Sequence, residues 1–303
     1  MTSEPRAGDV RVGLEPDTGR PARRFHPAAR VVLAALAMLV SALSPLPLLL
    51  IPGAQAYLNA ATPEVAGAFI IGMSVLPFLA AIGLVWLLMK YVDRRPMRES
   101  GVVWTRRSLP IFLGSIAAVV ALVVACGLAV EATGLLREGG SLGGGALWMV
   151  ILVALAQAFL LQGIPEEFIW RGYMLQTLSV RPWVAVLISA AGFASLHIIS
   201  QGGQQNALER VLYLAVPFGF GLLAGALVVQ TGSVWAAAGV HGGFHTGLLI
   251  CSLLGVGNGP AFWLASGGLL GIIGVVLLWL PERRTRQAQA SVDDARTSLP
   301  RTD

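Results

Sequence analysis

The sequence predicts an all-α, polytopic membrane protein with about eight transmembrane helices. Of its 303 residues, 55% are hydrophobic and only 12% are charged, and the mean hydropathy is +0.73. Soluble globular domains carry roughly 25% charged residues. The charged residues gather mainly at the two ends of the chain and in one internal loop, so long apolar segments remain between them.

Eight segments are apolar over about the 20 residues that a helix needs to cross the hydrocarbon core. We therefore expect a transmembrane helical domain at residues 28–282. Its predicted spans lie near residues 31–51, 66–89, 110–130, 146–165 or beyond, 183–199, 211–230, 233–250 and 262–280. The polar tails at 1–27 and 283–303 are predicted to be disordered and cytoplasmic.

The first apolar segment, Val31–Ile51, has two interpretations. The sequence Ala54-Gln55-Ala56 resembles a signal-peptide cleavage site. However, the apolar run is longer than the roughly 7–15 residues of a secretory signal. We expect a retained first span, with a cleaved signal as the alternative.

The Lys and Arg residues predict the orientation. If both termini are cytoplasmic, 19 of the 21 basic residues lie on the cytoplasmic side, and only Arg137 and Arg210 do not. Both the positive-inside rule and the even number of spans agree with this orientation. The same rule explains the net charge of +5, so we expect a multi-pass protein of the cell (inner) membrane that contacts the lipid bilayer and binds no nucleic acid.

The two cysteines carry little functional information. Cys126 and Cys251 lie in or beside apolar segments and have no CxxC spacing. Both are expected to pack as small hydrophobic side chains.

A charged turn interrupts the apolar chain after an uncharged run from Gly139 to Pro165. It contains Glu166, Glu167 and Arg171. Ionisable groups at membrane depth are costly and indicate a functional site. Glu167 and Arg171 are four residues apart, so on a helix they share a face and pair, while Glu166 points about 100° away. The structural alternative is an ion pair at the end of the fourth span.

Three of the four histidines lie in predicted spans. His241 and His245 share one helix face, with a spacing common for two metal ligands, although no HExxH pattern is present. His197 closes the stretch Phe193-Ala194-Ser195-Leu196-His197. A single histidine in a span commonly bonds one helix to another, but three in a chain with few other polar span residues favour a site.

These motifs, in this order, resemble the CPBP family of intramembrane proteases. The motifs are Glu-Glu-x-x-x-Arg at 166–171, Phe-x-x-x-His at 193–197 and His-x-x-x-polar at 241–245. The family includes the type II CAAX prenyl endopeptidases and bacterial abortive-infection proteins. The resemblance covers about residues 146–250, which we take as the motif-bearing core.

The resemblance implies a role for each acidic and basic motif residue. Glu166 would be the base that activates the attacking water, and Glu167 would be a supporting acid. Arg171 would hold both carboxylates. Family members have been described as metalloproteases and as glutamate-dependent proteases without a metal.

The resemblance also implies roles for the histidines. His197 would position the water, and His241 would stabilise the developing oxyanion. The family's last polar position is usually Asn or Asp and here is His245, which keeps a hydrogen-bond donor but adds an imidazole. A divalent metal such as zinc, bound by Glu166, His197, His241 and His245, is therefore an alternative to a site without a cofactor.

The predicted depths of these groups do not agree. At 1.5 Å per residue, counted from the cytoplasmic ends of the spans, Glu166 lies about 15 Å deep and His241 about 13 Å, but His197 lies about 24 Å deep. Either the fifth helix is tilted or it starts outside the hydrocarbon. The count also requires the fourth span to continue past Pro165 to about Gln176.

The sequence thus predicts an endopeptidase that cleaves a membrane-associated protein or peptide substrate at a site opening toward the cytoplasm. One alternative is a non-proteolytic scaffold or regulator of the same family. The other is a proton-coupled transporter, in which Glu and His pairs also occur within spans.

Overall fold

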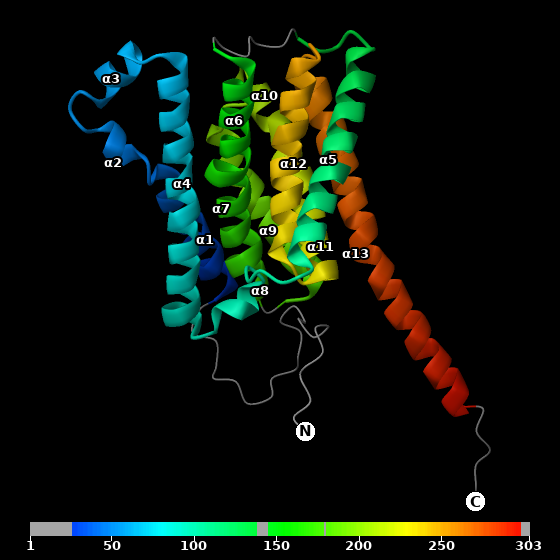
Figure 1. Ribbon diagram of the computed structural model, residues 1–303. Coiled ribbons are helices and arrows are strands. Elements are labelled where there is room, and N and C mark those ends of the chain that lie inside the picture. Colours follow the sequence, from blue (N-terminus) through cyan, green and yellow to red (C-terminus); the bar gives the residue numbers. More distant parts are fainter. Residues whose placement is uncertain (1–25, 138–144, 179, 298–303) are drawn as a thin grey trace, which may run out of the picture.

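Eight helical segments of the protein are long and apolar enough to cross a membrane, as predicted. The computed structural model describes residues 26–137, 145–178 and 180–297, and it has no β-strand within them. The spans are Pro27–Leu49, Pro63–Asp93, Ser108–Glu131, Leu147–Thr177, Pro182–Ile199, Ala207–Thr231, Val234–Leu253 and Pro260–Leu280. Figure 1 shows them side by side as one bundle.

The first two spans start at recognisable helix signals. The elements are α1 (Pro27–Leu43), α2 (Leu46–Leu49), α3 (Ala54–Ala60), α4 (Pro63–Leu87), the π-helix η1 (Leu88–Asp93), the 3-10 helix η2 (Met97–Ser100) and α5 (Ser108–Glu131). Proline at the first position of α1 and α4 has no N–H that would be left unbonded. The Thr62 hydroxyl caps α4 by accepting a hydrogen bond from the Val65 N–H at 3.5 Å.

The fourth and fifth spans are built from several helical pieces. The fourth comprises α6 (Leu147–Ala156), the π-helix η3 (Gln157–Gly163), α7 (Ile164–Glu167), the π-helix η4 (Phe168–Met174) and α8 (Leu175–Thr177). The fifth comprises α9 (Pro182–Leu196) and the 3-10 helix η5 (His197–Ile199). The remaining elements are α10 (Ala207–Tyr213), α11 (Ala215–Thr231), α12 (Val234–Leu253) and α13 (Pro260–Thr297).

Glycines let α12 lie directly against α5. A Cβ atom at Gly239 would be 2.6 Å from the carbonyl oxygen of Phe112, and one at Gly247 would be 2.7 Å from Val123. Contacts this close leave no room for a side chain, as expected at small-residue helix interfaces in membranes. These close contacts with α5 therefore set the position of α12 and of the histidines that α12 carries.

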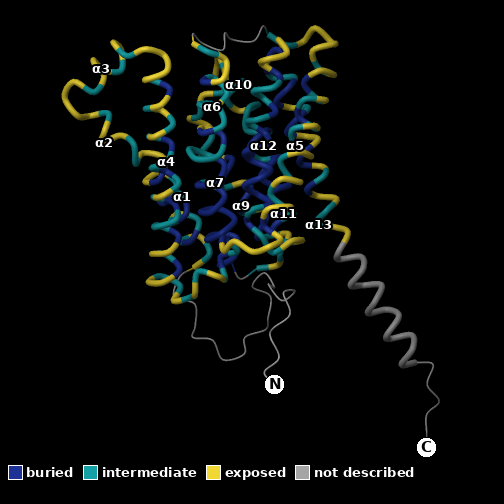
Figure 2. Tube along the Cα trace, in the orientation of Figure 1, coloured by how far each residue is buried: buried dark blue, intermediate teal, exposed yellow. Residues whose placement is uncertain are grey.

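Burial increases toward the centre of the bundle (Figure 2). In the most apolar 18 residues of the spans at 207–231 and 234–253, 61% and 67% are buried, compared with 17% in those at 27–49 and 108–131. All of residues 168–178, which continue the fourth span after the Glu pair, are buried. The charged motif therefore lies among the most enclosed helices.

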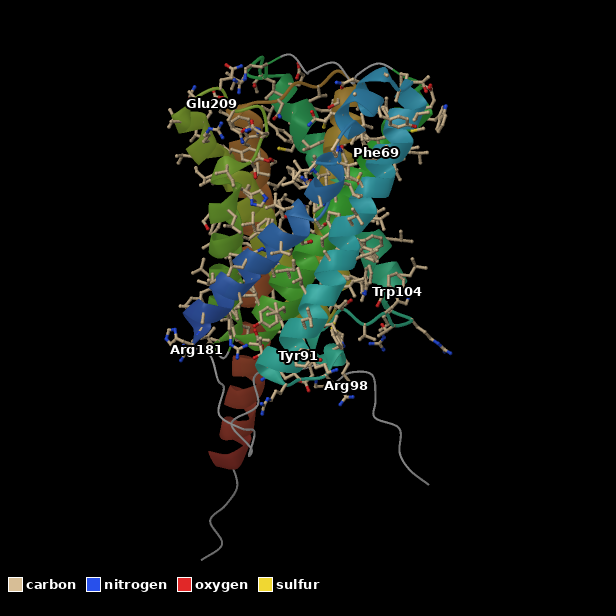
Figure 3. The ribbon with its side chains drawn as sticks, turned by 90° about the vertical axis from the view of Figure 1, so that its left-hand side faces the viewer. Phe69, Tyr91, Arg98, Trp104, Arg181 and Glu209 are labelled. Carbon is tan, nitrogen blue, oxygen red and sulfur yellow. The ribbon has the colours of Figure 1, made fainter. Side chains whose placement is uncertain are left out.

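The two ends of the bundle differ in charge. Arg98 and Arg181 lie at one end, with Tyr91, and Glu209 lies at the other (Figure 3). The buried ion pair between Arg30 and Asp93 joins α1 to η1. The basic end is thus the one predicted to be cytoplasmic.

The structure differs from the predicted tails in one place. The helix α13 continues to Thr297, although disorder is predicted from residue 283. The extension contains no glycine, and it continues a helix that is already nucleated, so each added residue needs only propagation. The predicted tail at 1–27 lies almost wholly outside the described residues, as does the end of the chain from 298.

Candidate active site

The fourth span carries the charged turn through the membrane domain instead of ending at it. Pro165 lies in the first turn of the short helix α7, and the helix continues to Thr177. The turns on both sides of α7 are π-helical. Such wide turns are rare and frequently occur at functional sites. The Glu pair is therefore within the span and not at its end.

Glu167 lies at the centre of a buried network. Its Oε1 accepts hydrogen bonds from Arg171 Nη1 at 2.9 Å and from His241 Nδ1 at 3.0 Å. The side chains of Glu167 and Arg171 are fully buried, and that of His241 is 2% exposed. The Arg171 guanidinium also lies over the ring of Phe193, 4.7 Å from its centroid. The network fixes the ring of His241 from the side opposite Glu166.

Glu166 faces two imidazoles. Its Oε2 atom lies 4.0 Å from His197 Nε2 and 4.0 Å from His241 Nε2. These distances are too long for hydrogen bonds, and Oε2 is buried without a hydrogen-bond partner. Polar groups separated by more than about 3.5 Å can be bridged by a water that has several polar partners. The three groups thus frame a position suited to a water molecule.

The hydrogen bonds of His197 and His241 determine which ring nitrogen of each carries a proton. His197 Nδ1 lies 2.9 Å from the carbonyl oxygen of Phe193, and His241 Nδ1 lies against the Glu167 carboxylate. Because a carbonyl or a carboxylate oxygen only accepts, each Nδ1 carries the proton of its hydrogen bond. In a neutral ring, Nε2 then presents a lone pair toward Glu166, and it donates only when the ring is doubly protonated.

His245 is near this cluster but not joined to it. Its half-buried ring stacks on His241, with centroids 5.2 Å apart and an interplanar angle of 26°. Among the described residues it makes no hydrogen bond or ion pair. The structure thus brings together Glu166, Glu167, Arg171, His197 and His241, with His245 in the layer beyond.

Within the described parts of the chain, no three His, Cys, Asp or Glu side chains are grouped as ligands of one ion. His197 and His241 form hydrogen bonds through Nδ1 and direct Nε2 toward Glu166, which is the orientation that a histidine ligating through Nε2 has. His245 stacks behind His241. The metal alternative stays a prediction.

The geometry agrees with a comparison against protein families. Residues 146–247 match the family model described as type II CAAX prenyl endopeptidase Rce1-like. This segment is similar to the Rce1-like family. It is about a third of the 303-residue chain and contains all six predicted site residues. A comparison with curated proteins gave no match.

The contacts within the Rce1-like segment resolve the disagreement in depth. His197 and Glu166 approach within 4.0 Å, so the predicted offset of about 10 Å between them is wrong. The count assumed that the helices are parallel and start at one level. Helix ends need not be level when the helices differ in tilt.

Aromatic rings that the sequence did not single out enclose the site. The ring of Phe220 on α11 lies 4.7 Å from that of His241, and Phe193 lies 4.4 Å from His197. Phe193 belongs to a recognised motif, but Phe220 lies in a uniformly apolar span, where no local signal marks it. The two rings contact each other with centroids 5.4 Å apart, so they form a continuous apolar wall beside the two histidines.

The Rce1-like segment is tightly packed between the site and the basic end. Trp170, Tyr173, Met174 and Leu175 are fully buried, and the Trp170 indole N–H lies 3.0 Å from Met38 Sδ on α1. An opening toward that end requires these side chains to move. The direction of opening stays a prediction.

Proposed function

We propose that the protein is an intramembrane endopeptidase that hydrolyses a peptide bond of a membrane-associated protein or peptide. The observation that carries this proposal is the unpartnered carboxylate oxygen of Glu166, which faces two imidazole nitrogens at 4.0 Å. The Rce1-like match at 146–247 supports membrane protease activity of the CAAX type. The match alone does not identify the substrate.

In the proposed mechanism, a water lies between Glu166, His197 and His241. Glu166 accepts one water proton while the water oxygen attacks the peptide carbonyl carbon, and the carbonyl electron pair moves to its oxygen. The same proton then passes from Glu166 to the leaving nitrogen, and the C–N bond breaks as the carbonyl reforms. General acid–base catalysis of this kind typically contributes about 10²–10⁴-fold in rate.

In the proposed mechanism, His241 carries a proton on Nε2 in addition to the Nδ1 proton that it donates to Glu167. His241 then donates to the water and afterwards to the oxyanion, while His197 accepts from the water and positions it.

We also propose that the basic end of the bundle faces the cytoplasm, with the protein in the inner membrane. Arg98 and Arg181 lie at this end, and Glu209 lies at the other. Positive residues accumulate on the cytoplasmic side of membrane proteins. Reporter fusions at residues 98 and 209 should give cytoplasmic and non-cytoplasmic signals, respectively. The opposite pattern would reverse the proposed orientation.

The decisive experiment compares the parent protein with Glu166→Gln in proteoliposomes. The probes are a farnesylated CAAX peptide and the same peptide without the lipid, and products are measured by mass spectrometry. We expect cleavage to fall by at least about 10²-fold, the scale of general base catalysis. Glu64→Gln, on the exposed first turn of α4, is the matched control and should retain activity.

The outcome also tests the other functions. If Glu166→Gln supports cellular function as well as the parent, the protein acts as a scaffold or regulator and the enzymatic proposal is wrong. Uptake of an ion or solute by parent proteoliposomes, lost in the variant without any cleaved product, would indicate a transporter. Cleavage of only the farnesylated peptide would assign a prenylated substrate.

A further inference from the structure

Two buried glycines, Gly221 and Gly225, lie one turn apart on α11. Small residues at this spacing let membrane helices approach closely. A Cβ atom at Gly225 would lie 2.7 Å from Val186 Cγ1 on α9, which is a contact of helix packing. A Cβ atom at Gly221 would instead lie 2.8 Å from Arg171 Nη2. The same spacing thus serves two contacts, and only that of Gly221 involves the buried network.

The Nη2 side of the Arg171 guanidinium is positioned by packing. Nη1 donates to Glu167, whereas Nε and Nη2 are buried and have no hydrogen-bond partner in the described part of the chain. The guanidinium lies over the ring of Phe193 on α9, 4.7 Å from its centroid. On α11, a side chain at position 221 would compete with Nη2 for space. The absence of a side chain at Gly221 therefore leaves room for the guanidinium to reach Glu167.

An alanine at position 221 should displace the guanidinium before it displaces a helix. The 2.8 Å contact with Nη2 is about 0.6 Å shorter than the 3.4 Å at which ordinary van der Waals contact begins. The other atoms nearest to the added Cβ atom belong to Ala190 and lie at 3.3 Å, close to that limit. The end of the long Arg171 side chain is the most flexible of these neighbours. The helices should thus tolerate the methyl group while Arg171 moves.

A displacement of Arg171 is transmitted to the proposed water position through two hydrogen bonds. Arg171 Nη1 and His241 Nδ1 share one oxygen, Glu167 Oε1, at 2.9 and 3.0 Å. His241 in turn directs Nε2 toward Glu166 at 4.0 Å. A shift of the shared oxygen therefore changes the direction of His241 Nε2. In an active site, a misplacement of about 1 Å can lower the rate about 10²-fold.

We propose that Gly221 is a positioning residue of the proposed active site. Because it has no side chain, it determines how closely the Arg171 guanidinium approaches α11, and through Glu167 it determines the orientation of His241. Gly221 touches none of the reacting groups and acts through Arg171. The effect on catalysis rests on the proposed function, whereas the contact between positions 221 and 171 is a property of the fold.

Gly221→Ala and Gly225→Ala form a matched pair for the test. Each adds one methyl group to the same face of α11 against a neighbour at 2.8 or 2.7 Å, and each gains the same helix propensity. The assay measures kcat and KM for the farnesylated CAAX peptide with the full chain in proteoliposomes. Each variant is made in the parent and in an Arg171→Lys background, because lysine keeps the charge but has no Nη2 atom.

Gly221→Ala should lower kcat of the parent about tenfold or more, the scale expected for a displaced catalytic group. KM should change little, because the loss concerns the transition state. In the Arg171→Lys background, Gly221→Ala should have no further effect. Gly225→Ala should leave kcat close to its reference value in both backgrounds. An unchanged kcat in Gly221→Ala, or an equal loss in both backgrounds, would overturn the proposal.

Denaturant unfolding in detergent separates a failure of this proposal from a failure of the proposed function. If the parent cleaves no peptide, the proposed function is wrong, but the contact is still tested. Gly221→Ala should raise the unfolding equilibrium constant of the parent at least about twofold more than that of Arg171→Met, the scale of coupling between groups in contact. Gly225→Ala should raise both equally. Equal effects of Gly221→Ala in the two backgrounds would overturn the proposal.

The test also covers a variant that fails to fold. If Gly221→Ala gives no folded protein, it is combined with Arg171→Lys, and the yield of monodisperse protein is measured. Recovery of folded protein in this double variant would support the contact between positions 221 and 171. Failure to recover it would overturn the proposal, because the methyl group would then clash with the helices and not with the guanidinium.

Discussion

Removing one member of the buried Glu167–Arg171 pair should destabilise the protein strongly. The two side chains are fully buried and lie 2.9 Å apart, and the Arg171 atoms Nε and Nη2 have no hydrogen-bond partner. Arg171→Met leaves the Glu167 carboxylate with His241 alone. Breaking a buried pair in this way costs about 3–5 kcal/mol, so we expect a loss of this size in the free energy of unfolding.

Glu167→Gln should cost a similar amount, because it removes the carboxylate that is hydrogen-bonded to the buried guanidinium. The double variant should be less destabilised than the sum of the two, by roughly 0.5–3 kcal/mol for groups in contact. In the double variant, the amide oxygen at position 167 still accepts a hydrogen bond from His241, and neither position 167 nor position 171 carries a charge. Denaturant unfolding of the purified chain in detergent measures all three variants against the parent.

Arg95 and Glu99 supply a control with the same i,i+4 spacing. Their charged groups are 3.9 Å apart and partly exposed, and exposed ion pairs typically contribute about 0.2–1 kcal/mol. Arg95→Met and Glu99→Gln should therefore change stability little. A loss below about 1 kcal/mol for Arg171→Met, the low range of ordinary substitutions, would refute the reasoning. Strict additivity in the double variant would do the same.

Three further predictions concern other parts of the molecule. Arg30→Gln leaves Asp93 buried without its partner and should cost about 3–5 kcal/mol in the same unfolding assay; an unchanged stability would argue against a retained first span. Gly239→Ala forces a Cβ atom against the Phe112 carbonyl at 2.6 Å and should cost about 1–3 kcal/mol. Gly83→Ala, with nothing within 4 Å, should instead stabilise α4 by up to about 1 kcal/mol, and equal effects at both positions would contradict the packing argument. His245→Asn should retain peptide cleavage before and after dialysis against a chelator, whereas loss of activity in either case would favour a metal-assisted site.

The main features of the fold were predictable from the sequence because they depend on local composition. Apolar length alone predicts the eight spans, since a helix has to satisfy its own backbone in lipid. The pairing of Glu167 with Arg171 follows from helical periodicity, and the structure contains this pair at 2.9 Å. The end of α13 was predicted less well, because a polar composition does not say whether an existing helix continues.

The geometry of the site was only partly predictable. The residue count gave nearly equal depths for Glu166 and His241, but it separated His197 from them, although both histidines lie 4.0 Å from Glu166. Residue counts assume parallel helices, and tilt is set by packing between segments that are far apart in the sequence. The sequence placed His241 and His245 on one helix face, and only the structure shows that His245 stacks behind His241.

The sequence by itself determined the class of the protein, the number of spans and the identity of the charged motif residues. The tertiary structure decided which atoms meet. It directs the Nδ1 atom of His241 to Glu167 and stacks His245 behind His241. The physical reason is that side-chain direction depends on the rotation and spacing of each helix. Here glycine contacts between distant spans, such as Gly239 with α5, fix both.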